Sequence, residues 1–406
     1  MSALLDFIQK NGRAPSIGLN IYPINNSRPQ FALNQFLNYK FSSSILIPVD
    51  SFSFQFTMPS NISGSITNYI QEGDIAELTG AGSTICTGII DVVDIETTSD
   101  GGDVVSIQGR NLLSQLEDQS TVNTLDNPMW GNNIPLPSAV GSVIQNTRIP
   151  YYIAQGAPAG NFLFATSPGE SKLTALQRFC EPLNCLIWGD PRGGVVVGRP
   201  NQGSPAIGSF FCDRDNRVAN VMSIKAIRAS TQIPNIILPV WNGQETVQKR
   251  VAAEQALYNP AYGPKRLRLA NHNVQRCVVV SNPDSSDPQS LSDINAIKVG
   301  GSNILQAYAL REMARDNMQE LNVQVNVKSH YNDDLQPILI DQVYQIKYPR
   351  AGVDEGMYCY QVEYTCDASQ GPKTSAYFCK LGTIVVGTSL TIAARQQTNS
   401  GNLQKL

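Results

Sequence analysis

Three carboxylate pairs are the residue sets in this sequence whose type and spacing come nearest to acid–base chemistry. The pairs are Asp91 with Asp94, Asp213 with Asp215, and Asp333 with Asp334. Glycoside hydrolysis needs two carboxyl groups roughly 5–10 Å apart across a cleft. Positions three apart on a strand face opposite sides, so Asp91 and Asp94 are poorly placed to share a site. Adjacent aspartates such as Asp333 and Asp334 are typical of turns, which favours solvated carboxylates over an active site.

Histidine and cysteine, the other residues that could supply catalysis or metal ligands, are sparse and scattered. His272 lies in ANHNV and His330 in KSHYND, and both are interpreted as surface loop residues. The eight cysteines form no CxxC pair and have no histidine at zinc-ligand spacing, so free thiols in apolar positions are expected. No GxSxG, P-loop or HExxH motif occurs, and GAGSTI at 80–85 lacks the third glycine of a dinucleotide-binding loop. The sequence therefore predicts a protein that is not an enzyme and that has no cofactor or metal site.

A basic segment and the overall charge bear on nucleic-acid binding. Lys265, Arg266 and Arg268 cluster in GPKRLRLANHNVQR and are candidate contacts to an acidic partner or to nucleic acid. A solvated insertion loop explains the same cluster equally well. The chain carries 30 Lys and Arg against 33 Asp and Glu, a net charge of −3, so binding driven by phosphate contacts is not expected. DNA passing through a neutral or acidic channel is still compatible with this charge.

Length and composition indicate a multidomain protein with real cores. The chain has 406 residues, enough for about two to four domains. Hydrophobic residues make up 42% and charged residues only 16%, below the ~25% usual for soluble domains. Such a polar, weakly charged surface suits a protein that other proteins cover. Neither a secretory signal nor a run of about 20 apolar residues is found, so assembly in a cytoplasm is expected.

Alternating patterns place the first third of the chain on β-strands. In SFSFQFTM, residues 51–58, four apolar side chains at every second position share one face, as in a half-buried strand. The runs STICTGIIDVVDI and DVVSIQGR flank Asp100-Gly101-Gly102 and predict a hairpin. Residues 30–110 are therefore interpreted as a small barrel or sandwich.

The middle of the chain predicts helices, a second hairpin and an insertion. A short helix is expected at 138–147, and a clearer one follows Ser167-Pro168-Gly169-Glu170, where Ser167 would cap the helix and Glu170 would complete a capping box. CLIWGDPRGGVVVGRP predicts a hairpin, which makes 120–200 a compact α/β module. Residues 240–290 are interpreted as an exposed insertion or long loop. A further helix is predicted at about 302–320.

The last third of the chain is again rich in strand patterns. IDQVYQIKYP, GMYCYQVEYTCDA and SAYFCKLGTIVV are strand-like runs separated by Gly/Asp turns. Two earlier runs also alternate: RVANVMSIKAIRAS at 217–230, and NVQVNVKS directly after the predicted helix. Tyr358, Tyr360, Val362 and Tyr364 are expected to share one face of their strand. A second β-rich unit of about the same size as the first is therefore predicted.

The order of these motifs resembles phage Mu-type baseplate hub proteins, a contractile-tail family similar to the hub of T-even phages. The residues that carry the resemblance are Gly73-Asp74, Thr87-Gly88, Asp91, Gly109-Arg110 and Leu113 through Asp118. In that family a Gly-Asp strand precedes a strand with TG-I-D, and the next strand ends in Gly-Arg before a Leu/Asp turn. Three later blocks agree in order: PGESKLTALQRFCEPLNCLIWGDPRGGVVVGRP, RVANVMSIKA and LREMARDNMQELNVQVNVKS. The resemblance covers about residues 30–385.

The resemblance implies a mainly β fold with α+β insertions: two similar β-barrel domains plus two smaller inserted domains. The expected ranges are an N-terminal arm at 1–29, the first barrel at 30–118, an α/β insertion domain at 119–205, the second barrel at 206–230 and 329–385, an inserted domain with a basic loop and helix at 231–328, and a C-terminal tail at 386–406.

The resemblance also implies a structural function without catalytic residues. The family forms homotrimers whose two barrels per chain make a pseudo-sixfold ring that joins the sixfold tail tube to the threefold central spike and encloses the DNA-ejection channel. Expected partners are further copies of the chain, the spike protein, the tail tube protein, baseplate wedge proteins and the tape measure protein. The expected location is the tail baseplate of a virion that is assembled in the host cytoplasm.

Two alternatives belong to other functional classes. A tail-associated cell-wall glycan hydrolase would use carboxylates such as Asp213 or Asp333. A carbohydrate-binding baseplate protein would expose Trp130, Trp188 and Trp241 in a shared groove, although Trp188 lies in an apolar hairpin and is expected in the core.

Overall fold

The structure is a computed structural model, and it describes two long parts of the chain and several short segments. The long parts are 17–228, with gaps at 25–27, 58–64, 99–101, 122–129, 146, 155–156, 158–160, 167–168, 181–182, 184 and 214–218, and 321–384, with a gap at 368. The short segments are 236–240, 257–258, 277–281, 298–299, 302–303 and residue 318.

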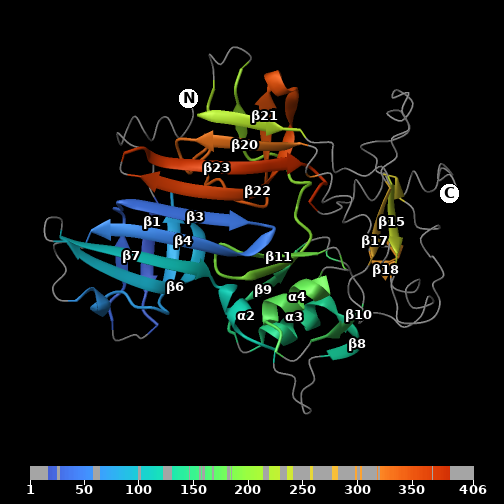
Figure 1. Ribbon diagram of the computed structural model, residues 1–406, viewed down its shortest axis with the longest axis horizontal. Helices are drawn as coiled ribbons and strands as arrows, with labels where there is room; N and C mark the ends of the chain where they lie inside the picture. The colour runs from blue at the N-terminus through green and yellow to red at the C-terminus, as the bar shows by residue number, and fades with distance from the viewer. Residues whose placement is uncertain are drawn as a thin grey trace.

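Two β-rich units, one from each end of the chain, form the body of the molecule (Figure 1). The first β unit consists of β1 (Ile17–Tyr22), β2 (Phe31–Leu33), β3 (Asn38–Ser44), β4 (Ile47–Thr57), β5 (Ile75–Gly80), β6 (Ser83–Thr98) and β7 (Gly102–Asn111). The second β unit consists of β13 (Ser209–Phe211), β14 (Ser223–Ile227), β20 (Asn322–Val327), β21 (Gln342–Tyr348), β22 (Val353–Asp367) and β23 (Gly371–Lys380). The mainly β architecture predicted from the sequence is confirmed.

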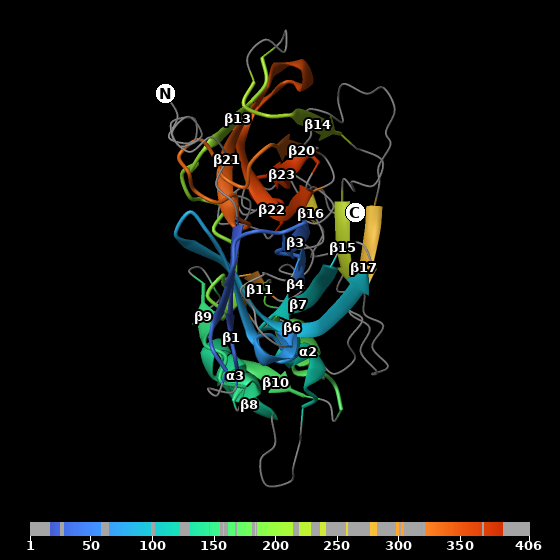
Figure 2. The same cartoon turned by 90° about the vertical axis from the view of Figure 1, so that its left-hand side faces the viewer.

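One sheet runs through both units. Its strands follow the order β14-β20-β23-β22-β3-β4-β7-β6-β5-β1-β2, with β21 attached to β22 and β13 attached to β21. The labels in Figure 2 descend in this order from β14 at the top to β6 below. The units meet where β3 pairs with β22, an antiparallel ladder in which Phe41 lies opposite Tyr364. The two units are therefore continuous through backbone hydrogen bonds.

Strict alternation of apolar residues explains the core of the first β unit. Phe52, Phe54 and Phe56 on β4 are 3%, 1% and 1% exposed, while the residues between them are more accessible. Each phenylalanine lies opposite a residue of β7, and the cross-strand partners of Phe54 and Phe56 are Ile107 and Val105. Burial of one such ring contributes about 1.5–3 kcal/mol, so this row fixes the register of the β4–β7 pair. The strand predicted at 51–58 is confirmed.

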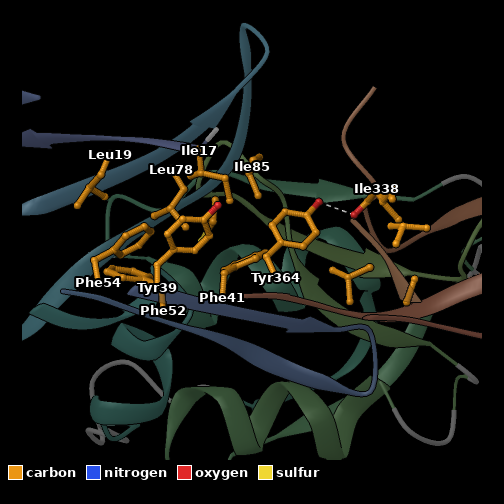
Figure 3. Close-up of a cluster of buried hydrophobic side chains, with 14 of the residues drawn as sticks. Ile17, Leu19, Tyr39, Phe41, Phe52, Phe54, Leu78, Ile85, Ile338 and Tyr364 are labelled. Carbon is orange, nitrogen blue, oxygen red and sulfur yellow. Dashed lines mark hydrogen bonds between the residues drawn. The ribbon is translucent and has the colours of Figure 1, made fainter. Parts of the chain in front are cut away.

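The cores of the two units merge into one apolar cluster. Figure 3 shows Tyr39, Phe41, Phe52 and Phe54 on one side and Tyr364 beside them, from the other unit. The Tyr364 hydroxyl donates a hydrogen bond to the backbone oxygen of Ile338, drawn as a dashed line in Figure 3. Because this core is shared, neither unit buries its apolar face alone.

A β-bulge in β22 corrects one prediction about its faces. The pairing of β22 with β23 shifts register between Cys359 and Gln361. Tyr358 and Tyr360 consequently pack in a cluster with Val343 and Trp188, whereas Val362 and Tyr364 pack in the main core. The prediction that all four residues share one face is therefore wrong, because the extra residue reverses the alternation.

An α/β module follows the first β unit. Its elements are α2 (Ser114–Asp118), β8 (Trp130–Pro135), α3 (Leu136–Ile144), β9 (Tyr151–Ile153), β10 (Asn161–Ala165), α4 (Lys172–Cys180), β11 (Leu186–Gly189) and β12 (Val195–Gly198). They surround their own core, which includes Leu136, Val140, Leu176 and Val195. The two helices and the β11–β12 hairpin agree with the sequence predictions. The predicted cap of α4 differs from the structure. The Ser171 hydroxyl accepts a hydrogen bond from the Thr174 amide at 3.1 Å, and Glu170 forms an ion pair with Arg178 instead of completing a capping box. Ser167, the predicted cap, lies outside the described residues.

The remaining strands lie between the two halves of the second β unit in sequence. β15 (Ile236–Val240), β16 (Leu257–Tyr258) and β17 (Cys277–Ser281) form one small sheet, and β18 (Lys298–Val299) pairs with β19 (Ser302–Asn303). Part of 240–290, interpreted as a loop, is therefore strand. The helix predicted at 302–320 cannot start at 302, because β19 occupies Ser302–Asn303, and nearly all of its other residues lie outside the described part.

Two predicted domain boundaries are also corrected. β20 falls within 231–328, which was assigned to an inserted domain, yet it pairs with β14 and β23 in the second β unit. β1 falls within the arm assigned to 1–29, yet it pairs with β2 and β5 in the first β unit. Residues 1–16 lie outside the described part. The sequence missed both strands as unit members because long-range pairing leaves no local signature.

Candidate functional site

The Gly73-Asp74 motif anchors the start of the chain to the first β unit. The Asp74 side chain is fully buried, and its carboxylate accepts hydrogen bonds from the Arg28 guanidinium at 2.5 and 2.7 Å. The backbone amides of Gln71 and Ile24 also donate to it, at 2.9 and 3.1 Å. Burial alone would raise the pKa of Asp74, but the hydrogen bonds from Arg28 and these amides outweigh burial and lower it. The role of this motif is structural, and Arg28 is a partner that the sequence did not reveal.

The glycines of the other two motifs allow the Phe52 ring to lie against the β6–β7 hairpin. A Cβ atom at Gly88 would collide with the backbone oxygen of Arg110, and one at Gly109 with that of Ile89. Both Cβ atoms would also meet the Phe52 ring. Here close approach of backbone and aromatic ring requires glycine, which explains both residues without any chemistry.

Arg110 joins the hairpin to the α/β module through an ion cluster. Its guanidinium pairs with Asp91 at 2.8 Å, with Asp118 at 2.8 Å and with Glu117 at 3.4 Å. Hydrogen bonds to Asp91 and Asp118 raise the pKa of Arg110 further above its ordinary value. Arg110 is 32% exposed, so this is a surface network of modest energy. The structure thus brings the motif residues Asp91, Arg110 and Asp118 together in one ion cluster. Glu117 is an additional member of that cluster.

Thr87 completes the motif set by touching the α/β module directly. Its hydroxyl donates a hydrogen bond to the backbone oxygen of Pro191, 104 residues later in sequence, at 2.9 Å. Pro191 lies in the turn between β11 and β12. All seven motif residues therefore shape the first β unit or attach its neighbours to it.

A cavity of about 240 Å³ lies where the first β unit, the second β unit and the α/β module meet. Its lining includes Ser43 and Asp50 from the first unit, Asp341 from the second, and Trp188 and Asp190 from the module. Trp188 is 5% exposed, which confirms its expected place in the core. Three carboxyl groups from different parts of the chain thus border one hollow.

Two of these carboxyl groups are perturbed by burial. Desolvation raises the pKa of Asp50 to about 7, although Ser43 and Asn111 donate hydrogen bonds to it. The Asn111 amide nitrogen lies 2.9 Å from the Asp50 carboxylate. Burial also raises the pKa of Asp341, whose carboxylate accepts the Tyr358 hydroxyl at 2.8 Å. The sequence did contain a signal for Asp50, because it continues the buried alternation of Phe52, Phe54 and Phe56.

His330 is buried, which corrects its interpretation as a surface loop residue. Its side chain lies between the Tyr39 hydroxyl at 2.7 Å and the Thr374 hydroxyl at 2.8 Å, and its ring stacks on Tyr364. Burial lowers the pKa of His330 to about 3, so the ring is neutral at ordinary pH. Both ring nitrogens are occupied by hydrogen bonds within the protein, which leaves no free position for catalysis or a metal ion.

The other candidate residues from the sequence do not assemble into a site. Asp333 accepts a hydrogen bond from Asn220 and lies in a turn with Asp334, as predicted. Asp213 is on a different segment, and Asp215 lies outside the described residues, as do Lys265, Arg266, Arg268 and His272. The side chains of Trp130 and Trp241 are likewise not described, so a shared tryptophan groove is untested.

The cysteines of the described part carry free thiols, and all but Cys366 are buried. No three His, Cys, Asp or Glu side chains in the described ranges are grouped to hold a metal ion. Among the helices that the structure describes, none has both the length and the apolar character to cross a membrane.

Comparison with solved structures gives this architecture a context. The tail protein from Neisseria meningitidis MC58 superposes with a TM-score of 0.69 at 16% identity, over 91% of this chain and 98% of that chain. The 43 kDa tail protein of prophage MuSo2 from Shewanella oneidensis superposes with a TM-score of 0.67 at 13% identity, over 92% of this chain and all of the other (100%). The chain has the fold of phage tail proteins. The resemblance inferred from motif order is thereby confirmed for the fold.

The tail-protein fold also extends to a secretion machine. A component of the E. coli type VI secretion system, described as structurally similar to the T4 tail proteins gp27 and gp5, matches with a TM-score of 0.52 at 9% identity. That match covers 89% of this chain and 76% of the other. No protein-family model and no curated protein sequence matches the chain.

Proposed function

We propose that this protein is the structural hub of a phage tail baseplate and acts as a homotrimer. The observation that carries the proposal is the internal repeat of the central sheet. Four strands of the second β unit, β14, β20, β23 and β22, continue directly into four strands of the first, β3, β4, β7 and β6. Each half is an antiparallel set with its apolar face on the shared core.

Two similar halves per chain suit an adaptor between different symmetries. A closed ring of three copies presents six comparable sheet halves, so it can meet a sixfold tail tube on one side and a threefold spike on the other. The hub encloses the channel through which DNA leaves the tail. Tail tube, central spike, baseplate wedge and tape measure proteins are the proposed partners, and the virion tail is the proposed location.

In this function the motif residues act as scaffold. Asp74, Gly88, Gly109 and Arg110 hold the β6–β7 hairpin, the start of the chain and the α/β module in fixed relative positions. No catalytic step is assigned to any of them.

The test is reconstitution with a spike protein encoded beside it. The two proteins are mixed, purified by size exclusion and imaged by electron microscopy. The proposal predicts a complex with threefold symmetry, six lobes around a central channel and one spike trimer per ring. A protein that stays separate from the spike, or averages without threefold symmetry, would contradict it.

The junction cavity favours one second candidate, the tail-associated glycan hydrolase. Asp50, Asp190 and Asp341 border that cavity, and a carboxyl group with a raised pKa is what a general acid needs. If the protein cleaves cell-wall glycan, the activity should be lost in Asp50→Asn and Asp341→Asn and retained in Asp333→Asn. Absence of cleavage by the wild-type protein would exclude this candidate.

A further inference from the structure

Asp50 lies at the contact between the first β unit and the α/β module. β11 of the module packs against β4, the strand that carries Asp50 (Figure 1). Gly189 ends β11, and a Cβ atom there would lie 2.8 Å from the Asn111 amide nitrogen and 3.4 Å from the Asp50 carboxylate. The neighbouring Val49 packs against the core of the module. The Asp50 and Asn111 side chains, which are joined at 2.9 Å, therefore form part of the surface against which the module packs.

The second β unit meets the module at the same place. Residues 339–342 line the junction cavity together with Trp188 and Asp190 of the module. Trp188 also packs with Tyr358 of β22 in a separate apolar cluster. All three parts of the molecule thus meet around the buried Asp50 carboxyl group, so a change in its charge acts on their contact.

The titratable groups that face Asp50 offer it no positive charge. From the elements packed around it they are Cys86 on β6, Asp190 after β11 and Asp341 before β21. The other described residues that line the cavity are uncharged, and none of them is Lys, Arg or His. Burial raises the pKa of the Cys86 thiol, which is therefore neutral. An ionised Asp50 would be desolvated and would meet only carboxyl groups, which destabilises the closed contact.

The hydrogen bonds around Asp50 suit its neutral form. Ser43 and the Ser44 amide on β3 donate to its carboxyl group, as does Asn111 at the end of β7. The side-chain oxygen of Asn111 is buried and has no hydrogen-bond partner within the described part of the chain. A protonated carboxyl group can donate its hydrogen to this oxygen when the amide turns over, whereas a carboxylate has no hydrogen to donate.

We propose that the α/β module closes over the junction cavity while Asp50 is neutral and opens as Asp50 loses its proton. Opening separates β11 and the turn after it from Asp50 and from residues 339–342, which lets water reach the ionised carboxylate. The movement takes place within one chain and does not depend on the homotrimer of the proposed function.

The direction of the pH effect follows from the raised pKa of Asp50. In the closed state this pKa is about 7, whereas a carboxyl group that opening exposes titrates near its ordinary value of about 4. The proton therefore favours the closed state fully below about pH 4, and this advantage is lost as the pH rises to about 7. Opening should become about tenfold more frequent with each pH unit across this range and should change no further above it.

Maleimide labelling of Cys86 measures the opening, because this thiol lines the cavity and is 3% exposed. The full-length protein is labelled between about pH 5 and about pH 8, and the modified Cys86 peptide is quantified by mass spectrometry. Dividing each rate by that of the same peptide when unfolded cancels the ordinary pH dependence of thiol chemistry. The normalised rate should rise about tenfold for each pH unit up to about pH 7 and level off above it.

Two variants test whether this rise belongs to Asp50. Asp50→Asn carries a neutral side chain of nearly the same shape at every pH, so its normalised rate should stay almost constant. Asp354→Asn removes a carboxylate from an exposed strand position and should keep the wild-type rise. A rise of equal size in Asp50→Asn, or a wild-type rate without a rise, would overturn the proposal.

Cys359 is an internal control for unfolding of the whole protein. It is buried in the main core that the two β units share, and it does not line the cavity. Local opening should make Cys86 react at least about tenfold faster than Cys359 near pH 8, after the same normalisation. Equal normalised rates for the two thiols would mean that the cavity opens only on global unfolding, which contradicts a movement of the module.

The outcomes also separate this proposal from the proposed function. A trimer whose Cys86 rate does not rise with pH would overturn the proton-controlled contact and leave the hub assignment intact. A monomer with the expected rise would support the contact and contradict the homotrimer. If Asp50→Asn does not fold, the wild-type curve and the comparison with Cys359 still decide the matter.

Discussion

The two β units build similar four-stranded halves from different aromatic residues. The first unit buries mainly phenylalanines, among them Phe41, Phe54 and Phe56, with one tyrosine, Tyr39. The second buries mainly tyrosines, among them Tyr358 and Tyr364, together with Phe210 and Phe378. A phenylalanine ring has no polar atom and can be buried by packing alone, whereas a buried tyrosine hydroxyl needs a hydrogen-bond partner. The Tyr358 hydroxyl donates a hydrogen bond to the Asp341 carboxylate, and the Tyr364 hydroxyl donates one to the backbone oxygen of Ile338. The ladder is therefore held mainly by apolar packing in the first unit, while the second adds several buried tyrosine hydroxyls that form hydrogen bonds.

The units also differ in the titratable groups that they bury. The first holds Asp50, whose pKa is raised to about 7, and Asp74, whose pKa is lowered. The second holds His330, whose pKa is lowered to about 3. Acid should therefore act in opposite directions on the two units through Asp50 and His330. Four substitutions test this comparison, from the largest expected effect to the smallest.

Gly109→Ala tests the packed end of the ladder. The added Cβ collides with the Ile89 backbone and the Phe52 ring, which are both fixed in the core, so we expect a loss of at least about 3 kcal/mol in the free energy of unfolding or failure to fold. Gly203→Ala is the matched control, because its Cβ would meet nothing within 4 Å. Urea unfolding of both variants measures the difference. A loss below about 1 kcal/mol at Gly109 would show that the Phe52 contact is loose.

Asp74→Ala tests the buried ion pair of the first unit. It leaves the Arg28 guanidinium, 11% exposed, without its partner, so a loss of about 3–5 kcal/mol is expected. Because the folded pKa of Asp74 lies below its unfolded value, its contribution is present above that unfolded value and disappears as the pH falls through the folded one. Asp354→Ala, at an exposed strand position, should change stability by about 0.5 kcal/mol or less. Similar effects at both positions would refute an anchoring role for Asp74.

Asp50→Asn tests the raised pKa at the junction cavity. The folded protein keeps this proton up to about pH 7, while the unfolded chain releases it near pH 4. The stabilising contribution of the proton is therefore complete below about pH 4 and is lost as the pH rises to about 7, a change of about 4 kcal/mol. The asparagine variant removes this slope and should be more stable than wild type at pH 8. If the wild type and the variant show the same pH dependence, Asp50 is ionised in the fold.

His330→Gln tests the opposite slope in the second unit. The unfolded histidine takes up a proton below about pH 6.5, but the buried ring does not do so until about pH 3. Its contribution to stability is therefore complete above pH 6.5 and falls by about 2 kcal/mol at pH 5. The variant should lose this part of the acid sensitivity, whatever its stability at pH 8. Unfolding curves at pH 5 and pH 8 measure it, and an unchanged difference would mean that the ring is accessible to protons.

Local patterns predicted the strands, the hairpins and two helices, because alternation and turn residues act over short distances. The phenylalanine row of β4 is an example. Burial of His330 was not predictable, since it depends on Tyr39 and Thr374, which lie 291 and 44 residues away. The bulge in β22 leaves no mark in its own sequence and reverses the faces of Tyr358 and Tyr360.

The mass of the purified protein in solution tests the central claim most directly. Light scattering at micromolar concentration should give three times the 44.2 kDa of one chain, because three copies with two similar sheet halves each supply the six positions of the proposed ring. The same mass should hold on dilution until the ring dissociates. A protein that remains at 44.2 kDa over the whole concentration range would contradict the proposed homotrimeric hub.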